Sequence, residues 1–268
     1  SYLETKKKRL EEAAWSVLTN PLHEKNLKEL QKALHLSIDQ IIETYVAYDL
    51  DISKNDNTVY QSLALRYVLH MHNLLKGSWH IQRQQTVVDF IKKANPKKIV
   101  DMGFGVPSQY VKVILEQGEQ KVILCDIDDS SIQFAEALLN LWAPQRWASQ
   151  VSCRKLDMNQ GEVIPNQDLY LFQSSLEHVR NPADYLEKHL KNSKEEAFFL
   201  FSLPIGPITP EHYIAWSTAQ EIFDWLTNFG LHIHESKIIG VNPEVDLFAD
   251  YHNFNYYDCF VLCHKIHV

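Results

Sequence analysis

The sequence KIVDMGFGVPS, from Lys98 to Ser108, decides the fold of this 268-residue chain. Its first five residues form a short apolar run that predicts a buried strand, and two glycines follow closely. Glycine adopts positive φ angles and lets a backbone approach a ligand, although such a turn can also be purely structural. In an open α/β sheet, ligands bind at the carboxyl ends of the strands. The stretch therefore predicts a strand followed by a candidate ligand-binding turn.

Beyond Asn95-Pro96, short apolar runs alternate with helical stretches, which is typical of a parallel sheet covered by helices. The last two predicted strands have no helix between them, so we expect an antiparallel hairpin there. The pattern predicts a doubly wound, mainly parallel seven-stranded α/β sheet. Its strands are expected at residues 98–102, 121–126, 151–156, 169–173, 197–203, 231–241 and 258–266, and its helices at 109–116, 130–142, 183–190 and 211–229.

The first 85 residues have a different pattern, with no glycine before Gly77 and a single proline, Pro21. Apolar residues recur there every three or four positions, which indicates amphipathic helices. Residues 49–58 are polar and predict a loop. We therefore expect an N-terminal helical module at residues 1–85, acting as a lid or a docking surface, and a core domain at residues 86–268.

Acidic residues end three predicted strands in succession. Asp101 ends the first, Asp126 ends the second about 20 residues later, and Asp157 follows the third. A carboxylate at the end of the second strand can accept hydrogen bonds from both hydroxyls of a ribose. A solvated loop acid is the alternative for Asp157 alone, but three acids in register favour a shared ligand.

These features resemble the class I methyltransferases that use S-adenosylmethionine (SAM), over residues 79–268. The resemblance implies SAM as the cofactor, a methyltransferase activity, and an Asp101 that borders the methionine part of SAM while Asp126 binds its ribose. It implies further cofactor contacts from Gly103, Phe104, Gly105, Ile127, Asp157, Met158, Gln173 and Ser174, with Ile127, Asp157 and Met158 around the adenine.

The segment after the fourth strand also resembles this family, because a Glu177-His178 pair precedes Asn181-Pro182. A general base is needed only when the acceptor must lose a proton, and His178 is the first candidate. His212 and Tyr213 are the next candidate catalytic residues. A helix that closes over SAM in the family would include Trp79, His80 and Arg83. A purely structural role for His178, in packing or helix capping, stays open.

Two alternatives to this assignment remain. Pro107 stands where the family pattern has a third glycine, and proline lacks an N–H donor, so a non-catalytic SAM-fold protein stays possible. A dinucleotide-dependent dehydrogenase would need glycine where Ser108 stands.

The composition of the chain limits the kinds of molecule that we expect it to bind. The formal charge of −8, with lysine and arginine scattered along the chain, disfavours nucleic acid, and no apolar run has the length of a membrane span. We expect a cytoplasmic protein, with a homodimer as one candidate oligomeric state. Its expected substrate is a small molecule methylated on oxygen or nitrogen, and a protein or peptide acceptor is the alternative. Cys259, Cys263, His264 and His267 superficially resemble a zinc site. Residues four apart on a strand lie roughly 13 Å apart, so we expect no metal.

Overall fold

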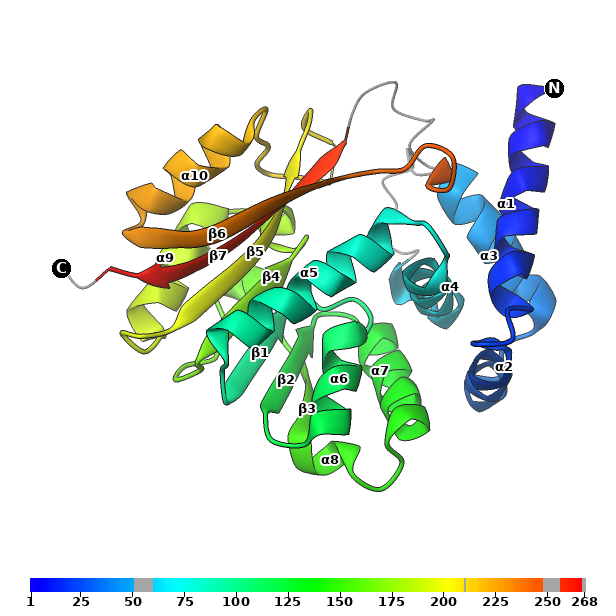
Figure 1. The fold of residues 1–268 in the computed structure, drawn as a ribbon, viewed down its shortest axis with the longest axis horizontal. Coiled ribbons are helices and arrows are strands. Elements are labelled where there is room, and N and C mark those ends of the chain that lie inside the picture. Colours follow the sequence, from blue (N-terminus) through cyan, green and yellow to red (C-terminus); the bar gives the residue numbers. More distant parts are fainter. Residues whose placement is uncertain (51–59, 210, 248–255, 267–268) are drawn as a thin grey trace.

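The computed structural model describes residues 1–50, 60–209, 211–247 and 256–266. A seven-stranded sheet in the order β3-β2-β1-β4-β5-β7-β6 forms its centre (Figure 1). The strands are β1 (Lys98–Met102), β2 (Lys121–Asp126), β3 (Val151–Lys155), β4 (Leu169–Gln173), β5 (Phe198–Ile205), β6 (Leu231–Gly240) and β7 (Tyr257–Lys265).

The pairing confirms the predicted mainly parallel sheet with a terminal hairpin. Strands β1 to β5 pair in parallel, whereas β7 lies antiparallel to both β5 and β6. The strand order reverses direction between β1 and β4. This switch point is where open α/β sheets form a ligand-binding crevice.

Helices cover both faces of the sheet. They are α1 (Tyr2–Leu18), α2 (Glu24–Ala33), α3 (Ile38–Leu50), α4 (Leu63–Leu74), α5 (Trp79–Ala94), α6 (Gln109–Gln117), α7 (Asp129–Trp142), α8 (Trp147–Gln150), α9 (Pro182–Asn192) and α10 (Ala219–Asn228). Helices α5, α6 and α7 contribute to one buried apolar cluster, and α9 and α10 contribute to another. None of the helices in the described ranges is both long and apolar enough to cross a membrane.

Local signals place the ends of several elements. Helix α5 stops at Asn95, which takes the left-handed conformation at φ 44°, and Pro96 then directs the chain into β1. The proposed division at residue 85 falls inside α5, and the domain boundary stays a prediction. The predicted loop at residues 49–58 lies largely outside the described residues, and Asp49 belongs to α3.

The predicted helix at residues 211–229 was wrong in its first half. Helix α10 begins only at Ala219, because the Thr218 side chain accepts a hydrogen bond from the backbone N–H of Glu221 at 3.2 Å and caps it. The described residues before Thr218 form a loop, and Ile205 and Trp216 make an isolated β-bridge across its base. Sequence periodicity did not reveal this loop, which carries candidate site residues.

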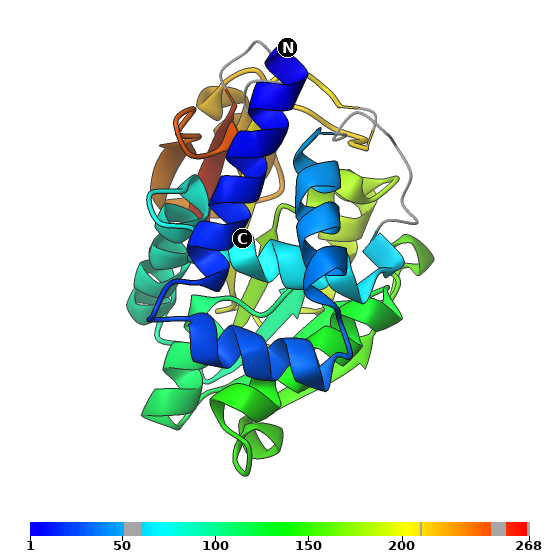
Figure 2. The same cartoon turned by 90° about the vertical axis from the view of Figure 1, so that its right-hand side faces the viewer.

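The N-terminal helices pack against the core near the glycine turn. Figure 2 shows α1 and α3 side by side, with α2 crossing below them. Their buried apolar cluster includes Phe134 and Leu138 of α7, and also Val106, the residue that follows Gly105. The predicted helical module therefore packs directly on the turn after β1.

Arg66 of α4 adds a buried polar link at this junction. Its guanidinium makes an ion pair with Asp128 at 2.9 Å and donates hydrogen bonds to the Ser130 hydroxyl and the Gly105 carbonyl. The side chain of Arg66 is 4% exposed. The N-terminal helices are thus joined to the ends of β1 and β2.

We expect Arg66→Ala to lower the free energy of unfolding by about 2 kcal/mol or more, because the change leaves Asp128 without its cation in a half-buried position. Urea titration followed by tryptophan fluorescence measures this loss. The exposed Arg180 offers a matched control, since Arg180→Ala should change stability by less than about 0.5 kcal/mol. Equal effects of the two substitutions would contradict a structural role for Arg66.

Candidate active site

The turn after β1 has the geometry of a ligand-binding loop. Gly103 and Gly105 have φ angles of 73° and 67°, a region that side chains rarely adopt. A Cβ on Gly103 would lie 2.8 Å from Cβ of Ser175, so the chain leaves no room for a side chain there. At Gly105, the nearest atom to such a Cβ is an Arg66 nitrogen at 3.8 Å. A side chain would therefore not fit at Gly103, whereas there is more space around Gly105.

Asp126 at the end of β2 holds this turn in place. One carboxylate oxygen accepts the N–H of Gly105 at 3.0 Å, and the other accepts the N–H of Asp128 at 3.1 Å. On the opposite side, the Ser131 hydroxyl donates to the Gly105 carbonyl. These bonds fix Gly105 without a donor from Pro107. An ionised carboxylate has about four acceptor positions, so Asp126 keeps capacity for two further donors.

Asp101 is buried at the end of β1. One of its oxygens accepts the Tyr110 hydroxyl at 2.6 Å and the Gln173 amide at 2.9 Å. Among the described residues, the other oxygen has no hydrogen-bond partner. Burial raises the pKa of Asp101 to about 7, although the Tyr110 and Gln173 hydrogen bonds lower it. A cationic donor next to this oxygen would satisfy it and favour the ionised form.

The ends of β2 and β3 bring the predicted adenine contacts near the same turn. Ile127 follows β2 and is 49% exposed, which is a large exposed fraction for an apolar side chain next to a candidate site. Met158 lies against the turn, with its methyl carbon 3.3 Å from the position of a Gly103 Cβ. Asp157 uses one oxygen to accept the N–H of Asn159 at 2.8 Å. This bond caps a short 3-10 helix, η2 (Met158–Gln160), and Asp157 is only half-buried.

Phe104 is the one residue of the predicted cofactor set whose side chain is packed in the apolar core. Its N–H and that of Gly103 both donate to the Cys125 carbonyl, at 3.2 and 2.8 Å. Phe104 therefore supports the turn, and its predicted cofactor contact stays a prediction.

Ser174 adopts φ 47°, an uncommon conformation for a residue other than glycine. Its hydroxyl lies 3.2 Å from that of Ser202 and accepts a hydrogen bond from Arg83 at 2.7 Å. Arg83 also forms an ion pair with the buried Asp258 at 2.5 Å and stacks over Trp79 at 4.8 Å. The ends of β4, β5 and β7 therefore meet at this arginine of α5.

The role of Arg83 at this point was only partly anticipated from the sequence, as a residue preceding the core. Arg66, Tyr110 and Asp258 were missed as site residues. Each of the two arginines forms an ion pair with a carboxylate, Arg66 with Asp128 and Arg83 with Asp258. Each pair joins segments that are far apart in the chain. No local sequence signal identifies them.

The predicted catalytic residues lie beyond the end of β4. The 3-10 helix η3 (Leu176–His178) carries Glu177 and His178, and the loop after β5 carries His212 and Tyr213. The N–H of Tyr213 donates to the Glu177 carbonyl at 2.7 Å, and Nδ1 of His178 lies 3.0 Å from the Glu211 carbonyl. The structure thus brings His178 and His212 together, with ring centroids 4.8 Å apart. The Tyr213 side chain is 57% exposed.

Burial changes the pKa values of Glu177 and His212 in opposite directions. It raises the pKa of Glu177 to about 8, and the nearby Asp258 adds to the shift while Arg83 opposes it. It lowers the pKa of His212 to about 4, with a further contribution from His178. At neutral pH, in the absence of a bound cation, the histidine is an unprotonated base or ligand.

The aromatic residues near the site have mixed roles. Trp216 is buried against Trp225, whereas Tyr256 contacts Trp79 beside Arg83. Phe248, Tyr251 and Phe254 lie outside the described residues.

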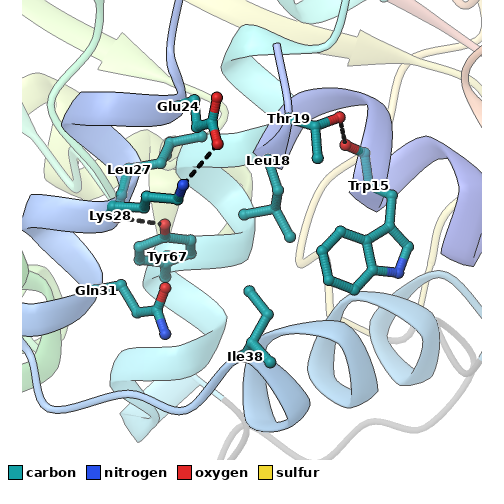
Figure 3. A pocket seen from close by; sticks show the side chains of 9 residues that line it. All are labelled: Trp15, Leu18, Thr19, Glu24, Leu27, Lys28, Gln31, Ile38 and Tyr67. Atoms are coloured by element: carbon teal, nitrogen blue, oxygen red, sulfur yellow. Dashed lines mark hydrogen bonds and ion pairs between the residues drawn. The ribbon is translucent and has the colours of Figure 1, made fainter. Parts of the chain in front are cut away.

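A pocket of about 170 Å³ lies elsewhere, among the N-terminal helices (Figure 3). Leu18, Leu27, Ile38 and Tyr67 line it together with the polar ends of Lys28 and Gln31. None of its lining residues touches the glycine turn or the histidines, and we do not assign it to the acceptor.

Comparison with known proteins supports the fold. No family model and no curated protein matches the sequence. Among solved structures, the [4+2]-cyclase SpnF matches with a TM-score of 0.56 and 12% identity, over 71% of this chain and 83% of that one.

Two matching structures are methyltransferases with S-adenosyl-L-homocysteine (SAH) bound. The O-methyltransferase of a Brevibacillus brevis trans-AT PKS multienzyme has a TM-score of 0.50 and 18% identity, over 68% of this chain and 71% of that one. Magnesium protoporphyrin IX methyltransferase from Synechocystis has a TM-score of 0.50 and 12% identity, over 85% and 94%. This chain has the class I methyltransferase fold. Because the fold also occurs in a cyclase, activity must be argued from the site.

The titration of Asp101 gives a testable pH dependence. Its pKa in the folded protein, about 7, lies above the ordinary value of 3.8, so the folded state holds more protons between these values. The contribution of Asp101 to stability should therefore fall as pH rises from about 5 to about 7.5. Urea unfolding across this range should show the wild type losing stability relative to Asp101→Asn, by up to about 1.4 kcal/mol per pH unit.

Asp168 is the control, because its pKa is shifted in the direction opposite to that of Asp101. Partial burial raises its pKa, but hydrogen bonds from Lys194 and from the backbone N–H of Lys98 bring it below the ordinary value. Its stabilising effect is present above that value and is lost as pH falls through the lowered pKa. The difference between the wild type and Asp168→Asn should be constant above about pH 5. A flat difference for Asp101→Asn as well would show that Asp101 is ionised throughout.

Proposed function

We propose that the protein is a SAM-dependent methyltransferase that acts on a small-molecule acceptor at oxygen or nitrogen. The observation that carries the proposal is the position of Asp101, Asp126 and Asp157 at the carboxyl ends of the three adjacent strands β1, β2 and β3, where β1 is followed by a turn with two positive-φ glycines.

The residues of this site fit the chemistry of SAM. SAM has a cationic sulfonium and ammonium, and the buried Asp101 oxygen that has no partner among the described residues is an acceptor for the ammonium. Asp126 keeps acceptor capacity for the ribose hydroxyls. The exposed Ile127 and the Met158 side chain offer apolar surfaces for the adenine ring.

The sulfonium supplies the activated methyl group, so the protein has to align the acceptor and exclude water. With SAM bound, a lone pair on the acceptor would form the new bond to carbon, and the electron pair of the carbon–sulfur bond would go to sulfur. The acceptor's proton must leave as well. We assign the handling of this proton to the acceptor side of the site, where one carboxylate oxygen of Glu177 and one nitrogen each of His178 and His212 lie within 4.8 Å of one another.

We favour a small-molecule acceptor because Glu177 is buried and the adjacent His212 is half-buried, although His178 is exposed. A protein or peptide acceptor, docked on the N-terminal helices, is the alternative. The expected homodimer and cytoplasmic location remain predictions from the sequence.

The first test is calorimetric titration of the purified protein with SAH. We expect micromolar binding, and Asp126→Asn should weaken it about tenfold or more, because one charged acceptor for the ribose is lost. Asparagine retains an oxygen that can hold the Gly105 N–H.

Asp129→Asn is the matched control, since Asp129 follows the same strand but is exposed and paired with Lys155. It should leave SAH affinity unchanged. If the folded wild type fails to bind SAH, the methyltransferase proposal is wrong and the non-catalytic alternative takes its place.

The acceptor class requires a second measurement. Incubation with SAM and a panel of phenols, alcohols, carboxylic acids and amines should release SAH above the background rate for at least one small molecule. His212→Ala should reduce that turnover while SAH affinity stays within about twofold, because the histidine acts on the acceptor side. Turnover only with protein or peptide substrates would favour the alternative acceptor.

A further inference from the structure

Glu177, His178 and His212 form a compact set of possible metal ligands. One carboxylate oxygen and one nitrogen from each imidazole all lie within 4.8 Å of one another. Two imidazoles and one carboxylate are a donor set that binds divalent transition metals and leaves further coordination positions open. Small side-chain rotations would bring the three atoms to a common ion.

The state of Glu177 supports a missing cation. Its side chain is 1% exposed, and among the described residues its Oε2 atom has no hydrogen-bond partner. A buried carboxylate without a partner is costly. The nearby Arg83 is already paired with the buried Asp258 at 2.5 Å, so this cation is engaged by another carboxylate.

The orientation of His178 also fits a ligand. Its Nδ1 atom lies 3.0 Å from the Glu211 carbonyl, which can only accept a hydrogen bond, so Nδ1 carries the proton. Nε2 then keeps its lone pair for a metal. Histidines that bind metals commonly donate their other ring N–H to a backbone carbonyl in this way.

The backbone holds the two halves of the set together. His178 lies on η3, and His212 lies on the loop after β5. The hydrogen bond from the Tyr213 N–H to the Glu177 carbonyl, 2.7 Å long, joins these segments next to the ligands. The geometry therefore needs little reorganisation on binding.

We propose that Glu177, His178 and His212 bind one divalent transition-metal ion, with Zn²⁺ as the representative, on the acceptor side of the site. The role of the ion rests on the proposed function: it would lower the pKa of an acceptor hydroxyl placed against it, and the released proton would pass to water. The expectation of no metal was based on the spacing of Cys259, Cys263, His264 and His267, and His267 lies outside the described residues. The site proposed here does not include Cys259, Cys263 or His264. Those residues lie on β7, and both cysteines are buried there.

The test is calorimetric titration of the metal-free, full-length protein with Zn²⁺ alone, followed by SAH titration of the same samples. His232, His234 and His264 form a second histidine group on β6 and β7, with ring centroids 4.4 to 5.4 Å apart. Because that group could bind Zn²⁺ weakly, the titrations use the His234→Ala background. We expect one Zn²⁺ per chain, with micromolar or tighter affinity.

Glu177→Gln and His212→Ala should each weaken Zn²⁺ binding about tenfold or more, while SAH affinity stays within about twofold. Bound Co²⁺ gives a second readout, because its visible absorption depends on the ligands and should be lost in both variants. The retained SAH affinity shows that the variants are folded.

The outcomes separate the two proposals. Zn²⁺ binding that is absent, or unchanged by both substitutions, would overturn the metal site while SAH binding keeps the methyltransferase proposal. Zn²⁺ binding at these residues in a protein that never binds SAH would overturn the proposed function and the role given to the ion.

Discussion

The Asp126 carboxylate is the constraint on which the site depends. By accepting the N–H groups of Gly105 and Asp128, it joins the turn after β1 to the end of β2. The positive φ angles of Gly103 and Gly105 carry an entropic cost that these hydrogen bonds help to offset. The turn thereby keeps its shape although Pro107 contributes no N–H. The missing N–H of Pro107 therefore affects the structure of the turn less than it affects direct hydrogen bonds from the backbone to a ligand.

A concentration of buried carboxyl groups follows from the same arrangement. Asp101, Asp126, Glu177 and Asp258 are all nearly inaccessible to solvent. Burying carboxylates is unfavourable unless cations or hydrogen bonds compensate. Arg83 compensates Asp258 directly, but one oxygen of Asp101 and one of Glu177 lack hydrogen-bond partners among the described residues. Each of these two atoms could accept a hydrogen bond from a cationic ligand.

Much of this architecture could be predicted from the sequence, because the strands are short apolar runs that end in acids. The predicted bounds of β1, β2 and β4 agree with the structure. Local patterns failed where tertiary contacts decide the conformation. Helix α10 starts later than its periodicity suggests, since Thr218 caps it and Trp216 pairs with Ile205.

The candidate site could be predicted from the sequence to about the same extent as the fold. Glycines and acids at strand ends have positions that follow from the strand pattern, so Gly103 and Asp126 could be placed. The position of the Phe104 ring could not be predicted, because the order of strands and helices along the chain does not show that this ring packs in the core. Arg66 comes from a helix outside the segment that resembles the family and Arg83 from a helix inside it, and only the fold shows which carboxylates they meet. His178 and His212 were separate candidates until the loop after β5 placed them together.

The N-terminal helices are more closely coupled to the site than a detachable lid would be. Val106 packs in their apolar cluster, and Arg66 bonds both the Gly105 carbonyl and Asp128. A ligand that stabilises the glycine turn must therefore also stabilise the packing of these helices, because binding to the folded state alone shifts every equilibrium linked to it. The same linkage acts in reverse, since displacing α4 would remove two contacts that shape the turn. The helical module is in this sense part of the structure that supports the glycine turn.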